Sequence, residues 1–177
     1  MQYQLFGRTV ESTYSFPAIG YAILGLRLVM GWIFLQAGLE KLFEDNWTAE
    51  GYLKFAIHPD NPFRDFFADM AGNGLVDALN IYGQIAIGLA LILGVAVRWT
   101  AFWGAIMMIL YWLTAWQGGI GDFIPLEHGY IVDDHIVYAM LLFGLGAFGA
   151  GRVLGLDAVI EKTEFVQKQP LLKYLLG

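Results

Sequence analysis

Seven residues could do chemistry because they carry polar or aromatic groups inside, or at the ends of, long apolar stretches. An ionisable or amide side chain is costly in such surroundings, so each should face a partner, a ligand or the nearest aqueous boundary. Carboxylates, an imidazole, a phenol and an amide can bond to a small organic ligand and move its protons, and an indole can stack on its ring. The seven residues are Arg27, Glu40, Gln84, Trp112, Asp134, His135 and Tyr138.

The spacing of these residues predicts a common pocket. Asp134 and His135 precede Tyr138 by four and three residues, so the three can share one stripe of a helix. Gln84 lies at a matching depth on another helix, so the stripe is expected to point toward it. The candidate ligand-binding site, in the outer half of a membrane, comprises Gln84, Trp112, Asp134, His135, Tyr138 and Glu40.

Several of the polar residues also have a simpler interpretation. Asp133 or Asp134 is expected to cap the following helix by accepting hydrogen bonds from its free N–H groups. Arg27 could extend to the inner lipid head groups, or it could hold an interior structural partner or an anion. No metal site is expected, because His128 and His135 lack a third histidine or cysteine nearby.

The elements that must position these residues are membrane-spanning helices. Hydrophobic residues make up 58% of the 177 positions and charged residues only 15%, and the mean hydropathy is +0.56. A soluble domain has about 25% charged residues. A membrane-spanning helix needs roughly 20 apolar residues, and four such runs occur. The predicted fold is an all-α integral membrane four-helix bundle in a single domain, with spans at about 19–43, 76–97, 99–117 and 134–151.

The segments between and after the spans also have a predicted role. The loop at 44–75 contains two stretches, 50–57 and 62–70, in which aromatic and charged residues alternate at roughly helical spacing. We expect short helices there that lie in the outer membrane interface. Within the second span, Ala86, Ala90 and Gly94 are four apart and are expected to form a close-packing face.

The basic residues predict the orientation. The side that holds both termini and the turn after the second span carries more lysine and arginine than the opposite side, so both termini are predicted to be cytoplasmic in a multi-pass protein of the cell membrane. Most acidic residues lie on the opposite side, and the sequence pI is about 4.9. Such an acidic exterior suits high salt and favours a halophilic source. The six basic residues of the cytoplasmic side are Arg8, Arg98, Arg152, Lys162, Lys168 and Lys173.

Three groups of motifs resemble the DoxX family of small four-helix membrane proteins. They are the segments 27–31 and 37–42, the glycine-rich and alanine-rich segment 83–94, and the segments 135–138 and 149–157. The family includes DoxD, the membrane subunit of an archaeal thiosulfate:quinone oxidoreductase, so the resemblance implies an archaeal source and a quinone-linked role as expectations. Most DoxX-like proteins have no assigned reaction.

Two function classes follow. The first is a scaffold or accessory subunit of a membrane complex, or a lipid or small-solute binder, with membrane lipids, a membrane or extracytoplasmic partner subunit or a second copy as partners and no nucleic acid. The second is a quinone-binding subunit of an oxidoreductase. Its quinone would bond to Gln84, His135 and Tyr138, with Asp134 or Glu40 as a proton route. The chain has no cysteine, so thiolate-bound redox centres are excluded and no covalently bound cofactor is implied.

Overall fold

The computed structural model describes residues 2–5, 7–11, 15–117 and 132–177. These residues are mostly helical, as the composition predicts. A short N-terminal hairpin, in which β1 (Gln2–Leu5) pairs antiparallel with β2 (Arg8–Glu11), departs from the all-α expectation. The long helices are α1 (Phe16–Phe43), α4 (Gln84–Leu93), α5 (Val97–Ala115) and α6 (Asp134–Ala147).

Two helical runs among the described residues are long and apolar enough to cross a membrane. They are Phe16–Phe43 and Gly74–Leu93, and only 22% of the residues in the apolar window of each are buried inside the protein. The second run is continuous through α3 (Gly74–Ala78), the π-helical turn η2 (Leu79–Gly83) and α4. Helix α6 is a shorter apolar helix. Apolar helices with so little burial are typical of membrane segments rather than of a soluble core.

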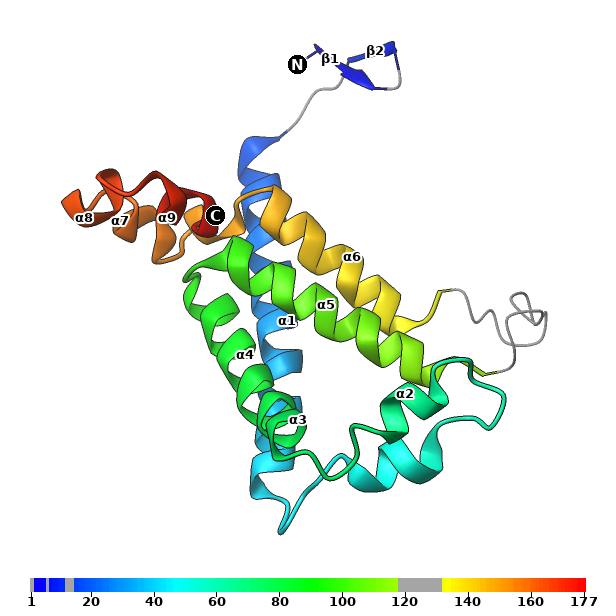
Figure 1. Ribbon diagram of the computed structural model, residues 1–177. Coiled ribbons are helices and arrows are strands. Elements are labelled where there is room, and N and C mark those ends of the chain that lie inside the picture. Colours follow the sequence, from blue (N-terminus) through cyan, green and yellow to red (C-terminus); the bar gives the residue numbers. More distant parts are fainter. Residues whose placement is uncertain (1, 6, 12–14, 118–131) are drawn as a thin grey trace.

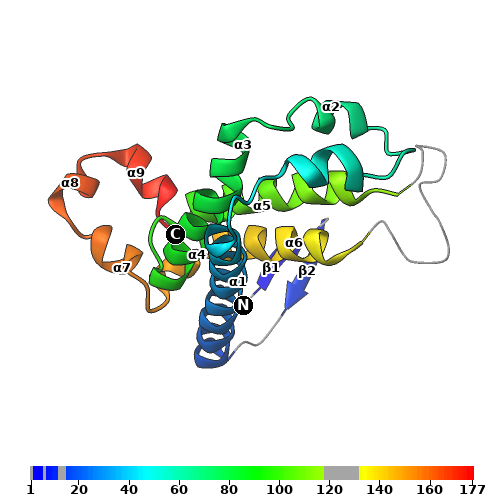
Figure 2. The ribbon, with the colours of Figure 1, turned by 90° about the horizontal axis from the view of Figure 1, so that it is seen from below.

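The long helices form two pairs that cross obliquely. Helix α1 packs along α4, and α5 packs along α6 (Figure 1). The pairs meet where α4 turns into α5 and diverge toward the other end, so Figure 2 shows α1 foreshortened while α5 and α6 run lengthwise. Gly94, with φ 70°, ends α4 in a left-handed conformation and allows the tight turn into α5.

Helix α1 is in backbone contact with η2 and α4 at three glycines. A Cβ atom on Gly88 would lie 2.5 Å from the Leu35 backbone nitrogen, and one on Gly38 would lie 2.9 Å from the Ile81 carbonyl oxygen. A Cβ on Gly31 would lie 3.0 Å from the Gly88 carbonyl oxygen. The expected packing face at Ala86, Ala90 and Gly94 is therefore wrong for Ala86, which is exposed, because the buried face of α4 passes through Gly88.

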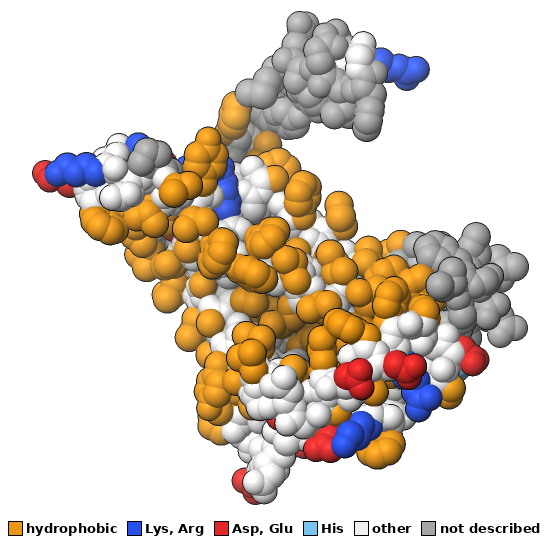
Figure 3. Space-filling view, in the orientation of Figure 1, with side chains coloured by type: hydrophobic (Ala, Val, Ile, Leu, Met, Phe, Trp, Pro, Cys, Tyr) orange, Lys and Arg blue, Asp and Glu red, His pale blue; other side chains and the backbone are white. Residues whose placement is uncertain are grey.

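The main core lies where the two pairs meet. Its buried side chains include Met30, Phe34, Leu91, Val97, Leu142 and Leu145. Large apolar side chains also cover the outside, and in Figure 3 they spread over the middle of the visible face while charged side chains gather at two ends. An apolar belt between two charged ends is the surface expected of a protein within a bilayer.

The loop between α1 and α3 packs under α5. It contains the π-helical turn η1 (Tyr52–Ala56) and α2 (Arg64–Ala68), which lie inside the two stretches where short helices were predicted. Leu53, Ile57 and Phe67 form a second core with Leu113 of α5. Asn61 donates hydrogen bonds to the carbonyl oxygens of Leu113, Thr114 and Trp116, and so satisfies the open end of α5.

After α6 the chain returns to the start of α5. It passes through η4 (Ala150–Arg152), α7 (Asp157–Ile160), α8 (Glu164–Gln167) and α9 (Pro170–Leu175), which project beside the α4–α5 turn in Figure 1. Gly149, with φ 64°, begins this return.

Candidate functional site

Two groups of polar side chains lie at opposite ends of the helices. We call Asn80, Tyr111, Asp133 and His135 the loop-end cluster, because they lie toward the end that carries the 44–75 loop. We call Arg98, Arg152, Asp157, Glu161 and Lys173 the C-terminal cluster, because α7 to α9 enclose it.

Tyr111 is the centre of the loop-end cluster. Its hydroxyl donates a hydrogen bond to the side-chain oxygen of Asn80 on η2. The ring of His135 meets the Tyr111 ring edge-on, with 6.0 Å between their centroids. Tyr111 therefore connects polar side chains of η2, α5 and α6. The π-helical turn η2 is itself notable, because such turns occur frequently at functional sites.

Asp133 fixes the imidazole of His135. The Nδ1 atom of His135 lies 2.7 Å from Asp133 Oδ2 and 3.4 Å from Asp134 Oδ1. The other oxygen of Asp133 accepts a hydrogen bond from the Ile136 N–H, so the predicted helix cap is confirmed and is Asp133. Ligand atoms of Asp133, Asp134 and His135 lie within 4.8 Å of one another and could hold a cation. The same atoms already serve as cap and hydrogen-bond partner.

Gln84 lies one helical turn after Asn80 and is 3% exposed. Its side-chain oxygen is buried and accepts no hydrogen bond from the described residues. A buried amide oxygen without a donor costs about 1–3 kcal/mol. Within the described part of the chain, this oxygen is therefore the one buried side-chain acceptor near the loop-end cluster that lacks a hydrogen-bond donor.

The remaining predicted residues do not join Gln84 in one pocket. Asp134 is exposed, since its neighbour Asp133 takes the cap position, and Glu40 is exposed on α1 and bonded to Gln36. Trp112 packs on Trp116, and Tyr138 packs against the main core. Helix α6 pairs with α5 over its length, and His135 meets Tyr111 of α5 rather than Gln84 of α4.

Asn80 is a member that sequence reasoning missed. It lies four residues before Gln84 in an apolar run. That spacing could have identified it, since two amides on one face of a membrane helix are seldom both directed to lipid.

Arg27 is enclosed at the other end of the helices. It is 1% exposed, and its Nη1 atom lies 2.5 Å from the Ala150 carbonyl oxygen and 2.9 Å from that of Val153. Its Nη2 atom donates to the Leu154 carbonyl oxygen at 3.2 Å. Of the alternatives that the sequence leaves open, the structure shows an interior backbone partner rather than extension to head groups.

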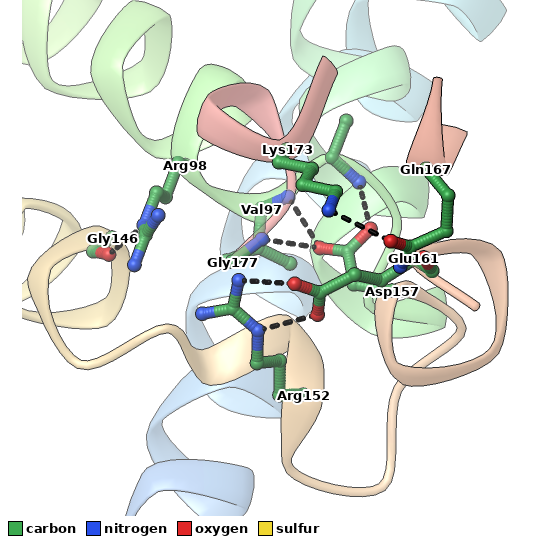
Figure 4. Close-up of polar contacts among 10 residues, drawn as sticks. Val97, Arg98, Gly146, Arg152, Asp157, Glu161, Gln167, Lys173 and Gly177 are labelled. Atoms are coloured by element: carbon green, nitrogen blue, oxygen red, sulfur yellow. Dashed lines mark hydrogen bonds and ion pairs between the residues drawn. The ribbon is translucent and has the colours of Figure 1, made fainter. Parts of the chain in front are cut away.

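Asp157 is a fully buried carboxylate that organises the C-terminal cluster. Its oxygens accept hydrogen bonds from the N–H groups of Ala96 at 2.7 Å, Val97 at 3.0 Å and Gly177 at 3.0 Å. Figure 4 shows Asp157 between the start of α5 and the end of α9. A carboxylate at a helix N-terminus is stabilised by the free N–H groups and the helix dipole.

Three cations surround a second carboxylate, that of Glu161. Arg152 binds Glu161 through two hydrogen bonds of 2.8 Å and 3.0 Å. The hydrogen bond from Arg152 lowers the pKa of Glu161, and the positive charges of Lys173 and Arg98 lower it further. The same hydrogen bond raises the pKa of Arg152. The cluster can therefore hold negative charge on an exposed surface.

Arg98 and Lys173 donate to neutral acceptors. Arg98 Nε lies 3.3 Å from the Gly146 carbonyl oxygen, and Lys173 Nζ lies 2.8 Å from the side-chain oxygen of Gln167. Together with Arg152 and Tyr174 they line an open pocket of about 360 Å³.

Comparisons with known proteins place this architecture in a family. The DoxX family model matches residues 22–117. An uncharacterized protein of Haemophilus influenzae is 29% identical over 149 residues, which cover 81% of this chain and 86% of that protein. This relative lends no support to the archaeal and halophilic source expected above. No solved structure gives a significant match. The family match covers more than half of the chain, from α1 to the end of α5, and the chain therefore belongs to the DoxX family.

Proposed function

We propose that this protein is a four-pass membrane protein that acts as a scaffold or accessory subunit of a membrane complex and binds lipid. The observation that carries the proposal is the set of hydrogen bonds that Arg27 makes to the backbone. This residue is the most deeply buried charged side chain of α1, and it donates to three backbone carbonyl oxygens of the chain itself. A charge that holds backbone together contributes to structure rather than to a reaction.

Two further helices complete the four spans of the proposal. Helix α5 has 19 residues, which gives a length of about 28 Å, close to the hydrocarbon thickness. Helix α6 is shorter, with 14 residues, and continues into η4 after a turn. The basic residues near α7 to α9 support cytoplasmic termini. Exposed Phe55 and Phe66 support an interfacial position for η1 and α2.

Extraction of the bound molecules tests the proposal. The protein is purified in a mild detergent, extracted with organic solvent and analysed by mass spectrometry. We expect phospholipid and only trace quinone. Quinone at close to one molecule per chain would contradict the lipid-binding scaffold.

The second candidate is a quinone-binding subunit, and the unpaired oxygen of Gln84 favours it. A quinol hydroxyl is a donor of the kind that this buried acceptor lacks. Tyr111 lies on α5, which adjoins α4, and the ring of His135 meets Tyr111, so these two side chains would supply further hydrogen bonds to the head group. The cysteine-free chain offers no thiolate-bound centre, so electrons would come from a partner subunit.

A substitution separates this candidate from the first. Binding of a short-tailed quinol is followed by quenching of tryptophan fluorescence in the wild type, in Gln84→Leu and in Gln36→Leu as the exposed control. A quinone site predicts loss of binding in Gln84→Leu alone. Equal quenching in all three proteins would rule out a site at Gln84.

A further inference from the structure

The C-terminal cluster contains a pocket built from three separate elements. Arg98 comes from the first turn of α5, Arg152 from η4, and Lys173 and Tyr174 from α9. Three cationic side chains and a phenol from distant parts of the sequence thus line one opening of about 360 Å³. Such a set is suited to an anion with several acceptor oxygens.

Among the residues that the structure describes, two of the three cations in the pocket form no direct ion pair. Arg152 is paired with Glu161, whereas no ion pair joins Arg98 or Lys173 to a carboxylate within the described residues. The buried carboxylate of Asp157 accepts three backbone N–H hydrogen bonds and forms no ion pair with Arg98 or Lys173. The pKa of Arg152 is raised by its hydrogen bond to Glu161 and also by the negative charge of Asp157. A bound anion could therefore form ion pairs with Arg98 and Lys173, whose hydrogen-bond acceptors are now neutral.

The walls of the pocket are held in place. Asp157 joins the start of α5 to Gly177, and Gly177 packs against the aliphatic part of Arg98. Figure 4 shows the bonds from Val97 and Gly177 to the Asp157 carboxylate, with Arg152 and Lys173 on neighbouring segments. A site whose walls are fixed before binding loses little conformational entropy when it is filled.

The apolar surroundings point to a lipid as the occupant. Trp99, Phe102 and Trp103 are exposed next to Arg98, and Trp99 and Trp103 pack edge-on. Leu171 and Tyr174 are exposed on α9 beside Lys173. Exposed aromatic residues are typical of the head-group level, and basic pockets on the cytoplasmic side bind anionic head groups. A phosphate in the pocket would place its acyl chains over this apolar surface.

We infer that Arg98, Arg152, Lys173 and Tyr174 form a binding site for the phosphate of an anionic phospholipid. The inference rests on the proposed membrane function and gives one of the bound lipids a defined site in the C-terminal cluster. The two arginines and Lys173 donate to the phosphate oxygens, and the Tyr174 hydroxyl contributes a further donor.

Native mass spectrometry with phosphatidylglycerol and phosphatidylcholine as probes tests the site. The proteins are the wild type, Lys173→Gln, Arg98→Gln and Tyr174→Phe, with Lys162→Gln as the control. Lys162 is exposed and lies in the same C-terminal segment, so its variant changes the net charge equally. We expect the wild type and the control to retain phosphatidylglycerol in preference to phosphatidylcholine. Lys173→Gln should lower that retention about tenfold, which corresponds to one lost charge-assisted hydrogen bond.

Lys173→Gln and Tyr174→Phe keep the test valid if Arg98→Gln does not fold, because both residues lie at the surface of α9. Equal retention of phosphatidylglycerol in Lys173→Gln and Lys162→Gln would overturn the site. Displacement of the lipid by inorganic phosphate at equal concentration would also overturn it, since the pocket would then recognise phosphate alone. A quinone-containing extract would contradict the proposed function separately from either result.

Discussion

The guanidinium of Arg27 is enclosed by the chain's own backbone. Cβ atoms on Gly94 and Gly155 would lie 2.9 Å and 2.7 Å from its Nη1 atom, so only glycine fits at both positions beside it. The carbonyl oxygens that it binds belong to Ala150, Val153 and Leu154, in the turn where the chain leaves α6 and free carbonyl groups need donors.

Replacing Arg27 by lysine should destabilise the protein. A lysine ammonium is a single point charge and cannot reproduce the planar fork that reaches three carbonyl oxygens. The expected loss is about 2–3 kcal/mol, since at least one buried acceptor loses its charged donor. Thermal unfolding in detergent measures it, with Arg64→Lys in the loop helix α2 as the control. Equal unfolding temperatures for the two variants would show that Arg27 is not a structural anchor.

The ion pair of Arg152 and Glu161 should make the stability of the folded protein depend on pH in the acidic range. The pKa of Glu161 is lower in the folded protein, so its contribution is present above the ordinary glutamate pKa of about 4.3 and disappears as the pH falls through the folded value. Glu161→Gln should therefore lower the unfolding temperature at neutral pH, and the difference from the wild type should shrink below about pH 4. Glu164→Gln, at an exposed position, is the control. A difference that stays constant across this range would contradict the assignment.

Residue types and spacing could predict part of the candidate site. A cap at Asp133 or Asp134 followed from their position before an apolar run, and the structure shows that it is Asp133. The burial of Gln84 followed from the cost of an amide in lipid. The partner of Tyr111 could not be predicted, because it depends on η2, an irregular π-helical turn that no periodicity indicates. The basic pocket was also missed, since it joins residues from three distant segments.

At the scale of elements, helix existence was easier to predict than helix packing. Apolar runs indicated the long helices, and Gly94 and Gly149 end or follow two of them in left-handed conformations. The sequence did not show that the helix pairs would cross obliquely, because small residues occur on more than one face of α4. The face of α4 that contacts α1 is the one that carries Gly88, which lies against the backbone of Leu35.

Gly88→Ala should separate α1 from α4. The added methyl group would lie 2.5 Å from the Leu35 backbone nitrogen, so the helices would have to move apart. The expected cost is about 1–3 kcal/mol, as for other overpacked interiors. Thermal unfolding compares it with Gly25→Ala, where a Cβ meets nothing within 4 Å and helix propensity improves. If Gly88→Ala is as stable as Gly25→Ala, the close contact of these helices is wrong.

For the whole molecule, the distribution of polar and apolar surface supports a membrane position. Apolar side chains cover the middle of the helices, while charges gather on the 44–75 loop and on α7 to α9 (Figure 3). The buried guanidinium of Arg27 bonds to the chain itself. The proposed account therefore places the loop outside the cell and the C-terminal cluster at the cytoplasmic head groups.

Labelling of single cysteines tests this topology most directly. The chain has no cysteine of its own, so Asp60→Cys in the loop and Lys168→Cys after α8 can each be studied alone, and both positions are exposed. With an impermeant thiol reagent on intact cells, the account predicts labelling at position 60 and none at position 168 until the membrane is opened. Labelling at position 168 but not at position 60 on intact cells would contradict the orientation, and with it the cytoplasmic lipid site.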